Sequence, residues 1–161
     1  MEEISHKYIL LKDHEGYIVE RTILYLGLST KRSPTQVLRG ELLEALPEAE
    51  QPKDSSKVAL VGIDRKSLRL ECSLECITRL TEEDTNLLLA ISSVEERYQT
   101  YLDRIRLDFG RKIGLGSRVY VTIKGVSKVL PGVVWYKGGL VSCSGTMFGV
   151  ELTVKIGRAH V

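Results

Sequence analysis

The sequence has few of the residues that metal centres and disulfide frameworks need. Its three cysteines, Cys72, Cys76 and Cys143, are a sparse and odd set, which is typical of reduced thiols in a cytosolic protein. Cys72 and Cys76 would make only half of a zinc site, because no second cysteine pair accompanies them and the three histidines are scattered along the chain. We therefore expect no metal ion and no other cofactor.

Neither sign of charge dominates, and long hydrophobic runs are missing. The chain has 23 basic and 21 acidic residues, a formal net charge of +2 and no block of arginine or lysine, so we expect no nucleic-acid partner. No apolar run approaches the length of a membrane span, and the start is unlike a secretory signal. We therefore expect a cytoplasmic protein without a membrane partner.

The sequence also lacks catalytic signatures. It has no phosphate-binding Gly-x-x-x-x-Gly-Lys-Ser/Thr loop, no His-Glu-x-x-His motif and no dinucleotide fingerprint. The neighbours of Cys143 are serines and a glycine, which supply neither a general base nor a helix start that would lower the pKa of its thiol. We expect no catalytic residue in this chain, and no activity from the chain alone.

Residues 1–110 are predicted to form an α+β region. Residues 8–12 and 17–28 would be two strands joined by a turn, because turn-forming residues separate two β-branched or aromatic runs. A helix is predicted from Ser33, which suits the cap position and is followed by a proline that suits the first turn, to Leu46. Further strands are predicted at residues 58–63, 67–72 and 74–80.

A long amphipathic helix is predicted to follow these strands. Thr81 is a suitable helix cap, and the acidic residues after it favour the positive end of the helix dipole. Apolar residues then recur at steps of three and four up to Ile105, so we expect one helix ending near Leu107. Its apolar stripe would pack on the preceding strands; a coiled-coil seam for a partner is the less favoured alternative.

Residues 116–152 carry the only specific functional signal. Over residues 119–124, β-branched residues alternate with polar ones, which predicts a half-buried strand. Glycines punctuate the rest, and further strands are predicted at residues 133–137, 140–143 and 148–153. Short strands joined by glycine turns are typical of a small barrel. The predicted fold class is therefore α+β: N-terminal strands and a long helix, followed by an incomplete SH3-like barrel.

The order of residues in this stretch resembles the CAP-Gly family. The resemblance rests on Gly132, Val134, Tyr136 and Gly138, followed by Gly145-x-x-x-Gly149-Val150-Glu151-Leu152. It implies an SH3-like barrel whose groove captures the acidic, aromatic-ending tails of tubulin and of microtubule plus-end proteins. The peptide-binding candidates are Tyr136, Met147 and Phe148. The candidate structural glycines, which would permit turns or a close approach of the backbone, are Gly132, Gly138 and Gly149.

Two departures from the family pattern limit this resemblance. Family members usually place Trp or Phe where this chain has Met147, which fills apolar grooves but lacks a flat aromatic face. The Gly-Lys-Asn-Asp-Gly loop of many members does not follow Leu152, and the final residues resemble the translated start of a sequencing adapter. We therefore expect a partial CAP-Gly domain over residues 111–154 and a non-native tail over residues 155–161.

A longer resemblance extends to the CYLD-like family of deubiquitinases. It rests on four segments, Leu87–Ile91, Glu95–Tyr98, Pro131–Val134 and Phe148–Leu152. It implies the N-terminal recognition fragment of a cysteine-type deubiquitinase that hydrolyses linear and certain lysine-linked, non-degradative ubiquitin chains and restrains NF-κB signalling. The implied partners are the tails of tubulin or of microtubule-associated proteins, or an NF-κB signalling scaffold. The implied location is the cytoplasm, including the cytoskeleton.

Two alternatives stay open. The chain would also fit a non-catalytic CAP-Gly adaptor of the microtubule cytoskeleton, and downstream sequence would decide between them, because only a deubiquitinase carries cysteine and histidine boxes. An independent small enzyme is disfavoured by the missing catalytic constellation.

Overall fold

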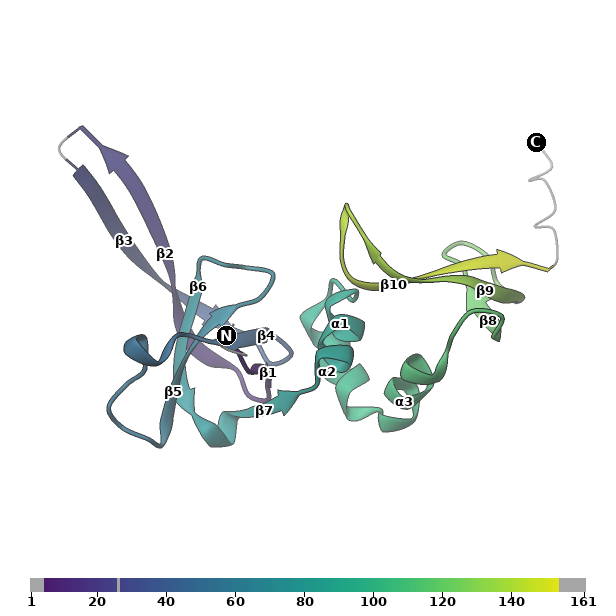
Figure 1. The fold of residues 1–161 in the computed structure, drawn as a ribbon, viewed down its shortest axis with the longest axis horizontal. Coiled ribbons are helices and arrows are strands. Elements are labelled where there is room, and N and C mark those ends of the chain that lie inside the picture. The colour runs from purple at the N-terminus through teal and green to yellow at the C-terminus, as the bar shows by residue number, and fades with distance from the viewer. Residues whose placement is uncertain (1–4, 26, 154–161) are drawn as a thin grey trace.

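The computed structural model describes residues 5–25 and 27–153, which form two antiparallel sheets with three helices between them (Figure 1). The first sheet has the strand order β3-β2-β6-β5-β4-β1-β7, and the second has the order β10-β9-β8. In the described part of the chain, no helix is long and apolar enough to cross a membrane.

The first sheet contains β1 (Lys7–Leu10), β2 (His14–Leu24), β3 (Gly27–Val37), β4 (Leu42–Ala45), β5 (Lys57–Gly62), β6 (Leu68–Ser73) and β7 (Ile77–Leu80). The helices are α1 (Glu82–Leu89), α2 (Val94–Leu102) and α3 (Arg104–Lys112), and short 3₁₀ turns lie at Glu48–Glu50 and Leu74–Cys76. The second sheet contains β8 (Arg118–Thr122), β9 (Val129–Leu140) and β10 (Cys143–Leu152).

Two hydrophobic clusters lie on opposite faces of the first sheet. Leu10 and Leu43 belong to a cluster that also includes residues from β3 and β7, the two ends of the strand order, so this sheet curls around its core. Their neighbours Ile9 and Leu42 belong to the second cluster, which packs against helices α1 and α3. Successive strand residues point to opposite faces, which explains why β1 and β4 are apolar at consecutive positions.

The predicted helix over residues 33–46 is wrong. Ser33 and Pro34 lie in β3, and Pro34 pairs with Tyr17 at the outer edge of the sheet, where the missing backbone donor of proline is tolerated. The apolar residues at the end of the predicted helix stripe form β4 instead. Tertiary pairing therefore overrides a local sequence pattern that favours a helix.

The predicted turn at residues 13–16 is also misplaced. The hairpin is formed by β2 and β3, and pairing continues without interruption from His14 with Val37 to Leu24 with Gly27. β1 does not pair with β2; it lies between β4 and β7. The predicted strands over residues 58–63 and 67–72 match β5 and β6 within one residue at each end, whereas the strand predicted at residues 74–80 begins only at Ile77, because Leu74–Cys76 form a 3₁₀ turn.

The single long helix predicted after Thr81 is wrong, because three short helices occupy this stretch. The Thr81 side chain accepts a hydrogen bond from the Asp84 amide, as expected for a cap. Two further caps interrupt the apolar pattern: Ser93 accepts from the Glu96 amide at 3.3 Å, and Asp103 accepts from the Arg106 amide at 3.0 Å. Each cap starts a new helix, so the apolar stripe is divided among three helices.

In the second sheet, the predicted strand at residues 140–143 is wrong. Gly138 and Gly139 do not break β9, which runs on to Leu140, and Val141 and Ser142 make the turn into β10. Glycine has no side chain that a neighbouring strand must accommodate, so it can continue a strand where a packed residue lies close by. The α+β class is confirmed at the level of its elements. Among the described residues, the stretch predicted to form a barrel is an open three-stranded sheet.

Candidate functional site

An apolar groove lies where the helices meet the second sheet. It has a volume of about 330 Å³. Its lining includes Leu87, Ile91, Leu107, Met147 and Phe148, with Arg106 as its charged member. Ligands commonly bind in clefts of this kind, which are lined mainly by apolar side chains and contain a few polar groups that orient the ligand. The groove therefore unites two of the three residues predicted to bind a peptide.

The third predicted residue, Tyr136, is not part of this lining. Its hydroxyl donates a hydrogen bond to the Gly139 carbonyl, so the ring folds over the β9 backbone. A side-chain atom on Gly138 would lie 3.0 Å from that hydroxyl. Tyr136 is therefore occupied within its own strand, and the sequence could not show this because the bond depends on the β9 path through Gly138 and Gly139.

Gly145 sets how closely β10 approaches the helices. Its φ of +83° is in the region that favours glycine, and an added side-chain atom would collide with the Asn86 carbonyl oxygen and lie 2.5 Å from the Ala90 amide nitrogen. The start of β10 therefore rests directly on the last turn of α1. This contact places Met147 and Phe148 beside the helices and so forms one wall of the groove.

Lys137 fixes the other side of the same junction. Its ammonium group donates hydrogen bonds to the carbonyls of Arg111 and Ile113 at 2.9 and 2.7 Å, at the C-terminal end of α3. A cation at this end is favoured by the helix dipole and satisfies carbonyls without helical partners. The same nitrogen lies 5.7 Å from the centre of the Phe148 ring. Lys137 was not singled out from the sequence, where nothing distinguishes it from a solvated lysine.

Arg106 is the cation that the groove offers to a ligand. Neighbouring Arg111 is held by Asp84 at 2.6 Å and by Asp108 at 3.2 Å, and the hydrogen bond that it donates to Asp84 raises the pKa of Arg111. Within residues 5–25 and 27–153, the Arg106 guanidinium takes part in no ion pair, and the residue is exposed. A ligand carboxylate reaching the groove would therefore meet Arg106 rather than Arg111.

The three glycines predicted from the family pattern have backbones outside the left-handed region, so space rather than turn geometry favours glycine there. A side-chain atom on Gly132 would lie 2.5 Å from Val150, and one on Gly149 would lie 2.9 Å from Tyr136 and 3.0 Å from Trp135. All three therefore permit close packing of β9 against β10 or of a ring against the backbone.

Trp135 is an exposed aromatic residue that sequence reasoning missed. The register of β9 and β10 shifts at this point, because Gly149 pairs with Tyr136 while Val150 pairs with Val134, which leaves Trp135 as the extra residue of a bulge. Its side chain is 63% exposed. As the single tryptophan of the chain, it was visible in the sequence, but its exposure depends on the bulge.

None of the three cysteines has the surroundings of a catalytic thiol. Burial raises the pKa of the Cys72 thiol to about 11, so Cys72 is protonated at neutral pH and is a poor nucleophile. Cys76 is half-buried and Cys143 is exposed, and all three are free. Among the residues that the structure describes, no group of three or more His, Cys, Asp and Glu side chains is placed to hold a metal ion.

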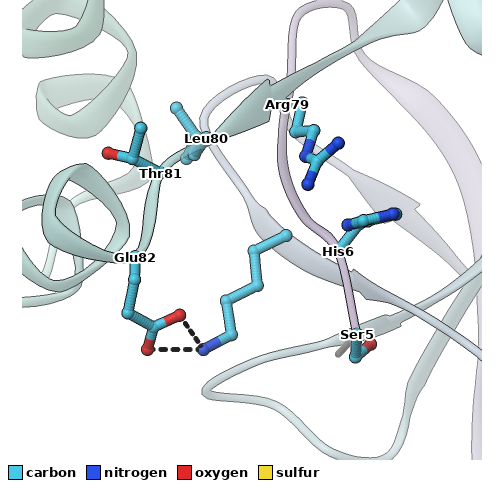
Figure 2. A pocket seen from close by; sticks show the side chains of 7 residues that line it. Ser5, His6, Arg79, Leu80, Thr81 and Glu82 are labelled. Atoms are coloured by element: carbon cyan, nitrogen blue, oxygen red, sulfur yellow. Dashed lines mark hydrogen bonds and ion pairs between the residues drawn. The ribbon is translucent and has the colours of Figure 1, made fainter. Parts of the chain in front are cut away.

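A second hollow, of about 450 Å³, lies between the start of β1 and the junction of β7 with α1 (Figure 2). His6 and Arg79 border it on one side and Glu82 on the other, and Lys7 forms an ion pair with Glu82 at 2.7 Å. The ion pair joins β1 to the first turn of α1, where an acidic residue also favours the helix dipole. Ser5 and His6 both line this hollow, but the Ser5 hydroxyl donates to the Ala45 carbonyl at 3.1 Å rather than to the imidazole.

Buried charges join the helices to the first sheet. Arg97 is 3% exposed and donates to the Ile91 and Leu88 carbonyls at 2.6 and 3.2 Å, and it forms an ion pair with Asp64 at 2.7 Å. Nearby, Glu41 is 4% exposed, and one of its oxygens has no hydrogen-bond donor among the described residues; Arg65 lies 3.5 Å away. Burial raises the pKa of the Glu41 carboxyl.

Comparison with known proteins relates the chain to one family. The family model of the CYLD SH3 domain matches residues 30–111, about half of the chain, from β3 to the end of α3. Mouse (Mus musculus) ubiquitin carboxyl-terminal hydrolase CYLD is 39% identical over 151 residues, which cover 89% of this chain. The human (Homo sapiens) protein of the same name is 39% identical over 110 residues, or 66% of this chain.

The chain is short beside these relatives. It spans 14% of the length of the mouse protein and 11% of the human protein in the matched regions. No solved structure gives a significant match to the chain. The family match covers the first sheet only from β3 onward and ends before β8, so the second sheet lies outside it.

Proposed function

Because the chain belongs to the CYLD SH3 domain family, we propose that it is the recognition end of a larger, CYLD-like deubiquitinase. The parent protein would hydrolyse linear and certain lysine-linked ubiquitin chains and restrain NF-κB signalling, with its catalytic groups outside this chain. This chain would bind a protein tail in the cytoplasm. The tail would belong to tubulin, to a microtubule-associated protein or to an NF-κB signalling scaffold.

The observation that carries the binding proposal is the groove with Arg106 as its charged member. An acidic tail that ends in an aromatic residue would place its ring against Leu107, Met147 and Phe148, and its carboxylates near Arg106. The aromatic ring of such a tail needs an apolar surface to bury it, and its carboxylate needs a cation close by. The groove supplies both.

Calorimetric titration of the full chain with a peptide ending in Glu-Glu-Tyr tests this proposal. Saturable binding is expected, and a peptide ending in Glu-Glu-Ala should bind at least tenfold more weakly because it fills less of the apolar floor. Arg106→Glu should also weaken binding at least tenfold, because it replaces attraction by repulsion. Arg104→Glu is the matched control: it changes charge by the same amount two residues away, at a position outside the groove lining.

Two results would contradict the proposal. One is a folded chain, shown by circular dichroism, that does not bind the tyrosine-ending peptide at all. The other is equal weakening by the Arg104 and Arg106 variants, which would show that overall charge rather than the groove governs binding.

A further inference from the structure

The hairpin of β2 and β3 extends far beyond the sheet to which it belongs (Figure 1). β6 pairs with β2 at Tyr17 and Ile18, and the Val19 amide donates to the Ser67 carbonyl, whereas β2 and β3 remain paired from there to Leu24 and Gly27. The outer half of the hairpin, residues 20–25 and 27–32, is therefore a two-stranded ribbon with exposed side chains on both faces. We call this segment the ribbon.

The end of the ribbon is apolar on every side. The exposed fractions are 87% for Ile23, 55% for Leu24, 104% for Tyr25 and 65% for Leu28. Ile23 and Leu24 are consecutive in a strand and so point to opposite faces, yet both are apolar and exposed. A ribbon that docks on a flat protein surface needs an apolar residue on one face only. Apolar residues on both faces suit a tip that is surrounded by an apolar medium.

Basic side chains lie on both strands of the ribbon just behind this tip. Between residues 20 and 32 the sequence has three basic residues, Arg21, Lys31 and Arg32, and one acidic residue, Glu20. Glu20 pairs across the ribbon with Lys31, and Arg21 pairs with Thr30. The cations therefore stand a short distance inward from the apolar residues on both strands. This order, apolar end then positive collar, matches the order of acyl chains and anionic headgroups in a membrane leaflet.

We propose that the ribbon tip inserts into the surface of an anionic lipid bilayer, with Ile23, Leu24 and Tyr25 among the acyl chains and Arg21 and Lys31 at the headgroups. We expected no membrane partner because the sequence has no apolar run long enough to span a bilayer and no secretory signal. Insertion of the ribbon tip into one leaflet requires neither feature. Tyrosine suits the boundary, because its ring is apolar and its hydroxyl polar. The first residues of the ribbon also precede residue 30, where the family match begins.

Sedimentation of the full chain with lipid vesicles tests the proposal. Binding is expected to vesicles of phosphatidylcholine with phosphatidylserine, and only weakly to phosphatidylcholine alone. The double variant Ile23→Ser, Leu24→Ser should lower the partition coefficient at least tenfold, because two apolar side chains no longer leave water. Arg21→Gln and Lys31→Gln should each lower it about fivefold, and added salt should do the same.

The matched control is the double variant Leu102→Ser, Ile105→Ser. These residues are 53% and 85% exposed, close to the values for Leu24 and Ile23, but they lie in α2 and α3 away from the ribbon. This control should bind vesicles as the unaltered chain does. As a direct measure of insertion, Tyr25→Trp should add blue-shifted fluorescence with anionic vesicles and be quenched by brominated acyl chains.

Three results would overturn the proposal. The first is failure of the unaltered chain to sediment with phosphatidylserine vesicles. The second is an equal loss of binding in the ribbon variant and the control variant. The third is a ribbon variant that changes the oligomeric state in gel filtration while vesicle binding stays unchanged, since the tip would then contact a second copy of the chain.

Discussion

Replacing Gly145 by alanine should separate the second sheet from the helices. Two effects add at this position. A non-glycine residue at a φ of +83° costs about 1–2 kcal/mol, and the new methyl group overlaps the Asn86 carbonyl at the end of α1, which costs about 1–3 kcal/mol more if the sheet must shift. The expected total loss of unfolding free energy is therefore about 2–5 kcal/mol.

Gly125 offers a matched control for the backbone part of this cost. Its φ is +85°, almost the same as at Gly145, but no atom lies within 4 Å of an added side-chain atom. Gly125→Ala should therefore cost only the backbone strain. Alanine reduces the entropy of the unfolded chain equally in both variants, so that effect cancels in the comparison. The difference between the variants measures the contact of β10 with α1.

Urea unfolding and hydrogen exchange by mass spectrometry would measure the effect. In Gly145→Ala, the amides of β10 and of the last turn of α1 should exchange faster, whereas those of β5 and β6 should not, because Leu60, Leu68 and Leu70 pack in the cluster on the far side of the first sheet. Peptide binding to the groove should be lost as well. Equal costs for Gly145→Ala and Gly125→Ala would refute the packing argument and leave only backbone strain.

Two further predictions concern the buried charges between the helices and the first sheet. Glu41→Gln should raise the melting temperature at neutral pH, because burial raises the pKa of Glu41: the folded state holds this proton more tightly, and stability is lost as pH rises through the raised pKa. The gain should shrink below the unfolded pKa of about 4.3, and an unchanged gain across a pH series of melting curves would count against this cause. Arg97→Met should lower the unfolding free energy by about 3–5 kcal/mol in urea titrations, because it leaves Asp64 and two carbonyls without their donor. A loss below about 1 kcal/mol would show that Arg97 is not needed to hold α1 and α2 on the sheet.

Several local features were readable from the sequence because they depend on neighbours in the chain. Thr81 caps α1, alternation identified β8, and the apolar runs of β5 to β7 were placed within a few residues. The family resemblance also followed from residue order. Its motif at residues 95–98 contains Arg97, but only the structure shows that this arginine is buried and joins two helices to the sheet.

The sequence by itself determined the α+β composition, the family and most strand positions, because hydrophobic alternation and capping act over a few residues. Only the tertiary structure decided that Ser33 to Val37 pairs as an edge strand, since that choice depends on β2 rather than on local propensity. Tertiary contacts likewise put Met147 and Phe148 into one groove and turned Tyr136 away from it. The position of Met147 and Phe148 depends on how closely β10 approaches α1, and that distance is set by Gly145 and by residues almost sixty positions away from it along the chain. The orientation of Tyr136 depends instead on the path of β9 through Gly138 and Gly139.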